Sequence, residues 1–490
     1  MGKVYLVGAG PGNPDLISVR GLSCLRRAQV VVHDRLISCS LLAETAPDCE
    51  RIFVGKEGHG CHTMSQAAIS QLLVDRARNG LLVCRLKGGD PFIFGRGGEE
   101  VEGLAEAGIE YEVVPGVTAP LGIAAYTGVP LTHRDHTSVV TFVTGHDVSG
   151  IDWNKTGVSE TLVVFMGLQH LSEIVERLLS AGRSPDTPAM AVRWGTRSDQ
   201  KTIAGTLADL PRLTAEARLA PPTTVIIGEV VGLHHKLDWF GKRPLSGQRV
   251  VVTRAAAQAA DLSRPLRELG ADVCEVPVIE LAPLDDYSAL DGAIGRLSSY
   301  DWVIFTSTNA VEYFLQRLRA CDLDARALRG RLCAIGPATR DALQAAHLRA
   351  DLVPDEAVSE RLAHSFASFD MSGKRVLLPR AAAAREVIPQ ALSALGAQVD
   401  IADAYRNIVP ADAAARVRSA GPFHWVTFTS GSTVKNWLSL GGRESLEGVR
   451  IASIGPATSD VIRKHGLAVA AEADPHTVSG LIDAIVRAAK

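Results

Sequence analysis

The chain has 490 residues, of which 46% are hydrophobic and 21% are charged. This composition is typical of folded domains and argues against extensive disorder, and a domain size of about 150 residues predicts roughly three domains. Lys and Arg number 51 against 54 Asp and Glu, a formal net charge of −3. This balance excludes the basic surface of a protein that coats nucleic acid. An anionic ligand would therefore have to meet positive charge that is gathered locally.

The eight cysteines include no C-x-x-C pair and no zinc-ribbon spacing, so we expect reduced thiols and no metal site. No apolar run reaches the ~18 residues of a membrane span. The first residues enter an expected strand without the charged and apolar regions of a signal peptide. We therefore expect a cytoplasmic protein that has neither nucleic acid nor a membrane as a partner.

Short apolar runs rich in β-branched residues predict strands that alternate with amphipathic helices along the whole chain. The expected strands are Val4–Val7, Gln29–His33, Leu81–Leu86, Val139–Thr144, Thr161–Phe165, Arg249–Thr253 and Asp301–Thr306. Strands interleaved with helical segments are typical of α/β architecture. The polar residues 236–246, with Gly and Pro, interrupt this pattern and predict a linker. We expect one domain at 1–235 and another at 247–490, with His234 and His235 as solvated residues rather than metal ligands.

The second of these domains repeats itself. The matching segments are Gly247–Arg254 with Gly373–Arg380, Trp302–Ser307 with Trp425–Ser430, and Ala334–Thr339 with Ser453–Thr458. An internal repeat of this size indicates two similar lobes. Loops rich in Gly, Ser and Thr follow the expected strands, and ligands bind to open parallel sheets at such loops. The repeat therefore predicts a ligand cleft between two lobes, although N-capping of helices by Ser and Thr explains any single loop.

A glycine-rich loop at Gly8–Pro14 follows the first strand and invites comparison with dinucleotide-binding loops. The third glycine of that motif would fall at Asn13, and Pro11 and Pro14 interrupt the start of the helix. An oxidoreductase is therefore a weak alternative. The loop fits either a close approach of the backbone to a ligand or a structural tight turn.

The segment Arg85–Glu100 is a more specific indication of a ligand site than the loop at Gly8–Pro14. An apolar strand runs into Gly88-Gly89-Asp90-Pro91, and a second group of glycines opens an acidic helix. Such a strand end can surround an adenosine, with Asp90 near the ribose or the amino-acid portion. Pro115–Pro120 adds a further glycine-assisted turn that carries a hydroxyl group. His59, Cys61 and His62 match no common metal spacing, and we expect them in a loop of the active site.

Residues 1–235 resemble the uroporphyrinogen-III C-methyltransferases, which are tetrapyrrole methylases. The matching motifs are His33–Ser38, Val54–Lys56, the Gly-Gly-Asp-Pro segment, Pro115–Ala119 and Val143–His146. The resemblance implies a non-Rossmann cleft between two α/β subdomains that binds S-adenosylmethionine. It places the cofactor contacts on Pro11, Gly88, Gly89, Asp90, Ile93, Thr118, Ala119, Met166 and Gly195. It also assigns Asp34 as the proton acceptor and Lys56 as the proton donor.

Methylation of an electron-rich pyrrole carbon fits these residue types. The sulfonium must be held in line with the carbon, and a carboxylate such as Asp34 can stabilise the cationic ring and collect a proton. Uroporphyrinogen carries several carboxylates, so Arg35, Lys56, Arg96 and Arg134 are candidates to pair with them. A structural ion pair explains each arginine equally well. The chain departs from the family pattern at Glu57, Ser70 and Phe165, which bears on details of substrate contact.

Residues 247–490 resemble uroporphyrinogen-III synthase, a bilobal parallel α/β fold. The supporting segments are Val251–Arg254, Phe305–Ser307, Ala334–Thr339, Ala404–Arg406 and Ser453–Thr458. The resemblance implies one lobe at about 247–282 plus 409–490 and another at about 285–405, joined by a two-stranded ladder. It assigns Tyr405 as a hydrogen-bond donor to the departing hydroxyl group. We expect Thr306, Ser430 and Thr458 to bind carboxylates, and the resemblance implies no cofactor for this half.

Together the two resemblances predict a bifunctional enzyme. Its second half closes hydroxymethylbilane to uroporphyrinogen III with inversion of ring D and loss of water, and its first half adds two methyl groups to give precorrin-2 for sirohaem or cobalamin. Because the methylase family is typically dimeric, a homodimer is expected. One alternative is a related corrin-ring methylase, and another is a methylase fused to a non-catalytic module that binds tetrapyrroles.

Overall fold

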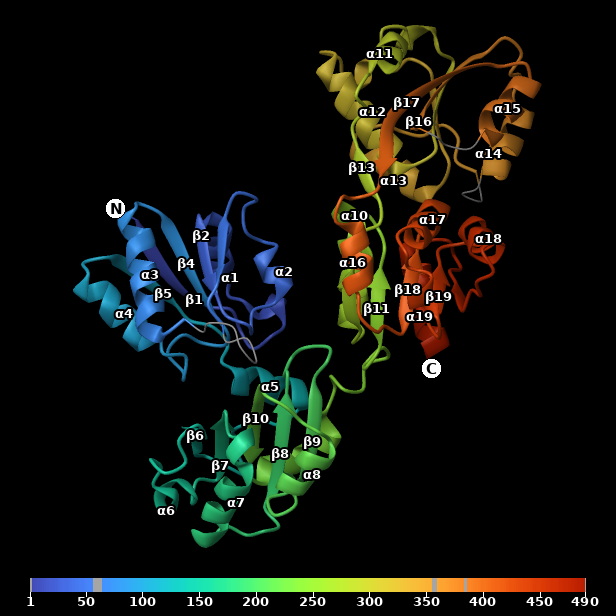
Figure 1. Ribbon diagram of the computed structural model, residues 1–490. Helices are drawn as coiled ribbons and strands as arrows, with labels where there is room; N and C mark the ends of the chain where they lie inside the picture. Colours follow the sequence, from blue (N-terminus) through green and yellow to red (C-terminus); the bar gives the residue numbers. More distant parts are fainter. Residues whose placement is uncertain (1, 56–63, 355–358, 383–385, 490) are drawn as a thin grey trace. The chain divides into compact units, whose positions relative to one another are not determined.

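The computed structural model of the protein describes residues 2–55, 64–354, 359–382 and 386–489 (Figure 1). Within these residues the strands form four five-stranded sheets, each accompanied by helices, which confirms the predicted α/β class. The chain divides into two compact units, one of residues 1–247 with 269–272 and the other of residues 248–268 with 273–490. Each unit contains two of the sheets, and each is described separately below.

The first sheet of the first unit is entirely parallel, in the order β3-β2-β4-β1-β5. Its strands are β1 (Lys3–Gly8), β2 (Val30–His33), β3 (Glu50–Phe53), β4 (Leu82–Lys87) and β5 (Glu110–Val114). Its helices are α1 (Val19–Arg27), α2 (Cys39–Leu42), α3 (Gln66–Arg78) and α4 (Gly97–Glu106), with a 3-10 turn η1 (Pro14–Leu16).

Alternation of apolar side chains along the strands explains why helices cover both faces of this sheet. Val4 and Leu6 of β1 pack with α3 and α4, whereas Tyr5 and Val7 pack with α1 and α2. Successive side chains of a strand point to opposite faces, so a strand that is apolar throughout must be covered on both. The result is a three-layer subdomain in which all five strands end at the same edge (Figure 1).

The second sheet of this unit is mixed, in the order β6-β7-β10-β8-β9. Only β6 and β7 pair in parallel, and the other neighbours are antiparallel. The strands are β6 (Val140–Thr144), β7 (Thr161–Phe165), β8 (Pro188–Arg193), β9 (Lys201–Thr206) and β10 (Thr223–Ile227). One face is covered by α5 (Ala119–Thr127) and η3 (Glu229–Leu233), and the other by α6 (Trp153–Thr156), α7 (Leu171–Ser180) and α8 (Leu210–Glu216).

The segment that follows this subdomain is largely exposed, as His235 and Lys236 are, but it is attached to the subdomain at individual residues. His234 begins the short helix α9 (His234–Leu237), and its Nδ1 lies 2.6 Å from the carbonyl oxygen of Thr127. Phe240 is buried, and its ring centroid lies 4.7 Å from that of Tyr126 in α5. Aromatic side chains within a polar stretch therefore attach this segment to α5, and the two units divide at residues 247 and 248.

The second unit holds two lobes of similar construction. The first lobe has the sheet order β12-β11-β18-β19-β20 and the second has β13-β17-β16-β14-β15. The first-lobe elements are β11 (Arg249–Val252), α10 (Ala256–Glu268), β12 (Asp272–Glu275), α16 (Ala413–Ser419), β18 (Trp425–Phe428), α17 (Gly431–Ser439), β19 (Arg450–Ser453), α18 (Pro456–Lys464), β20 (Ala471–Glu472) and α19 (Val478–Ala489). The second-lobe elements are β13 (Glu280–Ala282), α11 (Ser288–Ile294), β14 (Trp302–Phe305), α12 (Thr308–Ala320), β15 (Arg331–Ala334), α13 (Pro337–Ala345), α14 (Ser359–Ser365), β16 (Arg375–Ala381), α15 (Val387–Ala394) and β17 (Gln398–Ile408).

The repeat seen in the sequence recurs in the backbone geometry of the two lobes. Ser307 caps α12 with φ −164° and ψ 158°, and Ser430 caps α17 with φ −163° and ψ 158°. In both cases the serine hydroxyl accepts a hydrogen bond from the backbone N–H three residues later. The same strand–cap–helix unit is therefore built twice.

Two chain crossings connect the lobes. β13 pairs antiparallel with the end of β17, with Glu280 opposite Ile408 and Ala282 opposite Arg406. The expected boundary of the first lobe at residue 282 is therefore corrected, because backbone pairing puts 280–282 in the second sheet. Likewise, β17 extends to Ile408, beyond the expected limit at 405.

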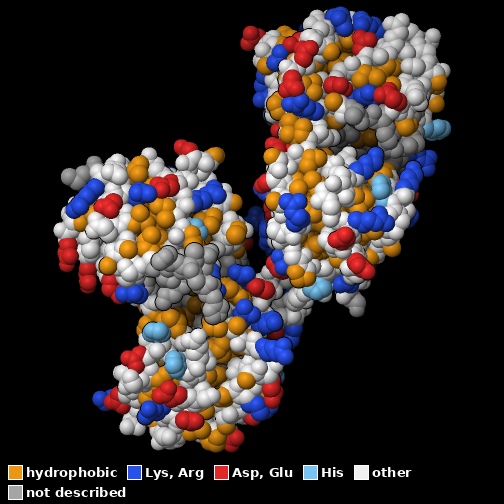
Figure 2. All heavy atoms as spheres, in the orientation of Figure 1, with side chains coloured by type: hydrophobic (Ala, Val, Ile, Leu, Met, Phe, Trp, Pro, Cys, Tyr) orange, Lys and Arg blue, Asp and Glu red, His pale blue; other side chains and the backbone are white. Residues whose placement is uncertain are grey.

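The surface agrees with the balanced charge of the chain. Figure 2 shows basic and acidic side chains interspersed over the visible face of each unit. Among the described residues, none of the helices combines the length and the apolar character that a membrane crossing requires.

Candidate functional site

Three loops of the first unit meet at the edge where its parallel strands end. Gly10 and Gly89 each donate a backbone hydrogen bond to the other, at 3.2 and 2.7 Å. A Cβ atom on Gly8 would lie only 2.6 Å from Cα of Gly116, and one on Gly116 would lie 2.3 Å from the carbonyl oxygen of Gly89. The loops after β1, β4 and β5 thus pack backbone against backbone, and the glycines are required sterically.

Asp90 holds two of these loops together. Its Oδ2 accepts a hydrogen bond from the backbone N–H of Gly116 at 3.0 Å, and its Oδ1 accepts one from that of Phe92 at 2.8 Å. The carboxylate predicted to contact the cofactor therefore also fixes the shape of the site. A side chain bonded to two backbone groups is positioned before any ligand arrives.

Helix α5 brings the other predicted cofactor residues to the same place. The position of a Cβ on Gly89 lies 3.6 Å from the nitrogen of Ala119, the first residue of α5. A Cβ on Gly122 would lie 2.4 Å from Cγ of Pro11, and one on Gly195 would lie 2.2 Å from Cγ1 of Ile123. Residues from three distant parts of the sequence are therefore assembled around the first turns of one helix.

The second subdomain is tied to this assembly by Asn13. Its backbone N–H donates to Oγ1 of Thr196 at 2.9 Å, and its side-chain Nδ2 donates to the hydroxyl of Tyr126 at 2.9 Å. Thr118, the residue before α5, makes no side-chain capping hydrogen bond. Its hydroxyl is thus not used to complete the helix, unlike the capping serines of the second unit.

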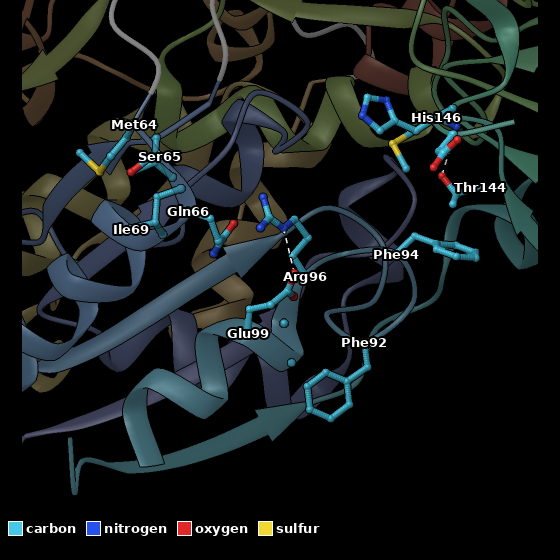
Figure 3. A pocket seen from close by; sticks show the side chains of 15 residues that line it. Met64, Ser65, Gln66, Ile69, Phe92, Phe94, Arg96, Glu99, Thr144 and His146 are labelled. Atoms are coloured by element: carbon cyan, nitrogen blue, oxygen red, sulfur yellow. Dashed lines mark hydrogen bonds and ion pairs between the residues drawn. The ribbon is translucent and has the colours of Figure 1, made fainter. Parts of the chain in front are cut away.

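A cavity of about 1310 Å³ opens beside this assembly, between the two subdomains (Figure 3). Its volume exceeds the range of about 300–1,000 Å³ that is usual for sites of small ligands. The described lining residues are Val54, Met64, Ser65, Gln66, Ile69, Phe92, Phe94, Arg96, Gly97, Gly98, Glu99, Thr144, His146, Asp147 and Met166. In the view of Figure 3, Met64, Ser65 and Gln66 lie on one side, Thr144 and His146 lie on another, and Arg96 lies between them.

Three exposed side chains at this cavity stand on backbone that non-glycine residues rarely adopt. Phe94, Arg96 and Met166 have φ values of 51°, 57° and 53°. Such left-handed conformations cost free energy and gather at functional sites. Phe94 is 42% exposed, and its ring centroid lies 4.8 Å from that of Phe165 in the other subdomain. The loop after β4 thus presents Phe94 to the cavity and also contacts the second subdomain.

Arg96 faces a carboxylate of its own chain. Its Nε donates to Oε1 of Glu99 at 3.0 Å, and this hydrogen bond lowers the pKa of Glu99 below its ordinary value. Both side chains are more than half exposed, so the pair contributes little to stability. An incoming carboxylate can therefore replace Glu99 at Arg96 at small cost.

The remaining residues predicted for methylation are less closely gathered. Asp34 follows β2, and its Oδ1 accepts a hydrogen bond from the backbone N–H of Leu36 at 2.9 Å. Arg35 and Arg134 are exposed, and neither is among the described residues that line the cavity. Lys56 lies outside the described residues, as do His59, Cys61 and His62. In the part of the chain that is described, no group of three or more His, Cys, Asp or Glu side chains could hold a metal ion.

A buried group of charges below the cavity was missed by the sequence analysis. Oε1 of Glu100 accepts hydrogen bonds from Lys87 at 2.8 Å, Arg85 at 3.2 Å and Gln66 at 3.1 Å. Burial lowers the pKa of Lys87, as does the neighbouring charge of Arg85, whereas Glu100 and Asp34 act in the opposite direction. The sequence does contain a sign of this buried group. Arg85 and Lys87 stand at alternate positions of an otherwise apolar strand, so their side chains must lie on the same face of the sheet.

In the second unit, Tyr405 lies beside the loop that carries Thr306. The Tyr405 side chain is 5% exposed, and its hydroxyl oxygen lies 3.2 Å from Oγ of Ser307. Its ring is stacked on that of Tyr313 with centroids 5.1 Å apart. Packing in the core of the lobe therefore fixes the ring, and the hydroxyl is directed at the residue next to Thr306.

The predicted residues of the first lobe have different surroundings. The Ser430 hydroxyl accepts a hydrogen bond from the backbone N–H of Thr433 at 3.3 Å, and therefore serves as the cap of α17. Thr458 is buried in the first turn of α18, with 4% of its surface exposed. Both lie at helix N-termini that follow neighbouring strands β18 and β19, where the helix dipole favours an anion.

Comparison with known proteins gives matches to both units. A family model of tetrapyrrole (corrin/porphyrin) methylases matches residues 3–211, and a model of uroporphyrinogen-III synthase HemD matches residues 260–483. The porphyrin biosynthesis protein HemD of Ruminiclostridium josui is 35% identical over 494 residues, which cover 99% of this chain and 98% of that protein. The chain belongs to the family of this porphyrin biosynthesis protein HemD.

Further relatives match the methylase side of this HemD-family chain. The uroporphyrinogen-III C-methyltransferase of Bacillus subtilis (strain 168) is 38% identical over 351 residues, 70% of this chain and 71% of that protein. A crystal structure of uroporphyrin-III C-methyl transferase from Thermus thermophilus complexed with S-adenyl homocysteine is 39% identical, covers 47% of this chain and 99% of that chain, and has a TM-score of 0.41. The predicted fusion of a tetrapyrrole methylase with a uroporphyrinogen-III synthase is confirmed, and a non-catalytic second half is not favoured.

Proposed function

We propose that the second unit cyclises hydroxymethylbilane to uroporphyrinogen III, with inversion of ring D and loss of water. The first unit then transfers two methyl groups from S-adenosylmethionine to this product and yields precorrin-2 for sirohaem or cobalamin. The observation that carries the methylation proposal is the cavity of about 1310 Å³ beside the glycine junction. Fusion is reasonable because the product of one unit is the substrate of the other.

The residues around α5 fit S-adenosylmethionine, which supplies an electrophilic methyl group when bound. Gly88 and Gly89 carry no side chain, and no side-chain atom lies within 4 Å of the Cβ position of Gly89, so the backbone there can approach a flat base, with Ala119 beside it. The Thr118 hydroxyl, which makes no cap bond, remains available to a polar group. Pro11, Asp90, Ile93 and Gly195 would complete the holding site, with Met166 between it and the cavity.

The cavity would hold the macrocycle. Phe92, Phe94 and Met166 offer exposed apolar surface to its ring atoms, and Arg96 exchanges Glu99 for a substrate carboxylate. Arg35 and Arg134 would bind outer carboxylates. Asp34 would stabilise the positive charge that develops on the methylated ring and accept the proton that the ring loses, and Lys56 would act as the proton donor that the resemblance implies.

In the second unit, we assign hydrogen-bond donation to the departing hydroxyl group to Tyr405. The core packing of its ring supports this role, because a fixed donor loses little entropy when it acts. Thr306, Ser430 and Thr458 would bind carboxylates near the helix N-termini. Closure of the bilane requires positioning of a reactive intermediate rather than a cofactor.

We also propose a homodimer formed through the methylase unit, in line with the family resemblance, and a cytoplasmic location. The seven described cysteines are all free thiols, which supports a reducing compartment.

Separation of the uroporphyrin isomers tests the proposed synthase activity of the second unit. Purified protein is supplied with hydroxymethylbilane but without S-adenosylmethionine, and the oxidised products are separated. A dominant type III uroporphyrin supports catalysed ring inversion, whereas type I alone would leave a methylase joined to a binding module.

Uroporphyrinogen III is then supplied with S-adenosylmethionine to test the methylation proposed for the first unit. Asp34→Ala should slow methylation with little loss of cofactor affinity, and a wild-type rate would remove Asp34 from the mechanism.

A further inference from the structure

We propose that Arg254 forms a carboxylate-binding subsite for the linear tetrapyrrole in the second unit. The inference rests on the proposed synthase function. It adds a cationic side chain to a substrate site for which the sequence predicted only side chains that carry hydroxyl groups. Arg254 follows β11 at the carboxyl edge of the first-lobe sheet. Because β11 and β18 are parallel neighbours, Arg254 and Ser430 lie at the same edge.

The guanidinium of Arg254 has incomplete hydrogen bonding. Its side chain is 18% exposed, and its Nη1 is buried without a hydrogen-bond partner. The paired carboxylate oxygen, Oδ2 of Asp261, is 3.7 Å away, and Asp261 is itself 70% exposed. Burial lowers the pKa of Arg254 below its ordinary value. Buried donors are nearly always paired in folded proteins, so this arrangement indicates a missing acceptor.

The internal repeat offers a comparison with an arginine at the equivalent position that has a close carboxylate partner. Arg380, which matches Arg254 in the repeat, donates from Nη2 to Oε1 of Glu386 at 2.6 Å. Glu386 lies six residues after Arg380, and the same step from Arg254 reaches Ala260. One lobe thus supplies a close carboxylate from its own chain, and the other has a methyl group in the corresponding place. A substrate carboxylate would restore the pairing.

The surroundings of Arg254 connect it to the proposed reaction site. Gln258, four residues further along the chain, donates from Nε2 to Oδ1 of Asn309 in the second lobe at 2.7 Å. Asn309 follows Thr306 by three residues and lies in the first turn of α12. Arg254 therefore stands near the place where the first lobe meets the Thr306 loop, beside which Tyr405 lies. A carboxylate bound there belongs to a molecule that can extend toward Tyr405.

Substitution in the full chain tests the subsite. Arg254→Gln should raise the KM for hydroxymethylbilane roughly ten- to hundredfold, as expected for loss of a charge-assisted hydrogen bond. Methylation of supplied uroporphyrinogen III should be unchanged, and the thermal unfolding of the chain should be unaltered. Arg264→Gln is the matched control, because this arginine of α10 is 76% exposed and pairs with Glu268. Its KM should equal that of the wild type.

A second variant separates ligand binding from a role in the ion pair. If Arg254 acted only through Asp261, Asp261→Ala would raise the KM as much as Arg254→Gln, and that result would overturn the proposal. We expect Asp261→Ala to keep the wild-type KM. If Arg254→Gln does not fold, Arg254→Lys tests the subsite instead. This variant keeps the positive charge but loses the planar guanidinium, so its KM for hydroxymethylbilane should rise severalfold. A wild-type KM would overturn the proposed subsite.

Failure of the subsite can be distinguished from failure of the proposed function. Wild-type protein that yields only type I uroporphyrin would contradict the synthase activity itself, before any variant is made. Wild-type protein that yields type III, together with a well-folded Arg254→Gln variant of normal KM, would contradict the subsite alone.

Discussion

The ammonium group of Lys87 lies 2.8 Å from Oε1 of Glu100, and the two side chains are 5% and 0% exposed. Arg85 and Gln66 donate to the same oxygen, so one carboxylate faces two buried cations. Gln66 also lines the cavity. The lining residue Gln66 is therefore bonded to a charge cluster that has little contact with solvent. Removing its single anion leaves two like charges together in a medium of low dielectric.

Substitutions in this cluster should differ in their cost. Glu100→Gln leaves Arg85 and Lys87 uncompensated and should lower the free energy of unfolding by about 3 kcal/mol or more. Lys87→Met leaves one cation opposite one carboxylate, so its effect should be smaller. Urea unfolding of the two variants at neutral pH measures the difference. Equal losses, or a larger loss in Lys87→Met, would contradict this account.

The stability should also depend on pH through Lys87. Burial places the pKa of Lys87 in the folded protein below its ordinary value, so the folded state releases this proton first as the pH rises. Between the two pKa values the unfolded chain binds more protons, and stability increases with pH. The contribution of neutral Lys87 to the free energy of unfolding is complete above the pKa of the unfolded chain, about 10.4. It is lost as the pH falls through the pKa that Lys87 has in the folded protein. The unfolding free energy of the wild type relative to Lys87→Met should therefore grow in the alkaline range, and a flat difference would refute the assignment.

Asp90 should couple cofactor affinity to the geometry of the loops. Asp90→Ala removes both acceptors for the N–H groups of Gly116 and Phe92, whereas Asp90→Asn keeps one. The affinity for S-adenosylhomocysteine should fall about tenfold or more in the alanine variant and less in the asparagine variant. Calorimetric titration measures it, with ring closure of hydroxymethylbilane as the internal control. Unchanged affinity in Asp90→Ala would exclude Asp90 from the cofactor site.

Phe94 should contribute to substrate binding more than to stability, because its ring is exposed to the cavity. Phe94→Ala should raise the KM for uroporphyrinogen III about three- to tenfold, in keeping with the loss of aromatic contact. Tyr111→Ala is a suitable control, since this side chain is comparably exposed at 39% and is not among the described lining residues. Steady-state methylation assays of the two variants make the comparison. A KM that rises equally in both would argue against a specific contact.

Tyr405→Phe should affect only the second unit. Loss of the hydroxyl beside Ser307 should reduce kcat for cyclisation by about a hundredfold, the lower range for a general acid, while methylation of supplied uroporphyrinogen III continues. Tyr313→Phe controls for packing, because its ring stacks on Tyr405 and its hydroxyl has no proposed role. Similar losses in both variants would show that packing, not proton donation, is responsible.

Much of the fold could be predicted from local patterns. The apolar residues Val4–Val7 predict a strand buried on both faces, and β1 (Lys3–Gly8) is covered by helices on both sides. The repeated Trp–Val–x–Phe–Thr–Ser segments predict two matching lobes, and Ser307 and Ser430 adopt the same cap geometry. Such features depend on residues near one another in the chain, so the sequence displays them directly.

The assembly of the site was decided by tertiary structure. Asn13 and Thr196 are 183 residues apart and form one hydrogen bond, and no local pattern specifies which loops meet. The same holds for Glu100, which an acidic helix would ordinarily expose, and for Phe240, which is buried within the stretch 236–246 that was expected to be a linker. The sequence by itself determined strand periodicity, the glycines at strand ends and the repeat, because these reflect short-range sterics and burial. Only packing of whole subdomains decided the cavity, its buried charges and the unmet donor of Arg254, because such contacts form between surfaces that are distant in the chain.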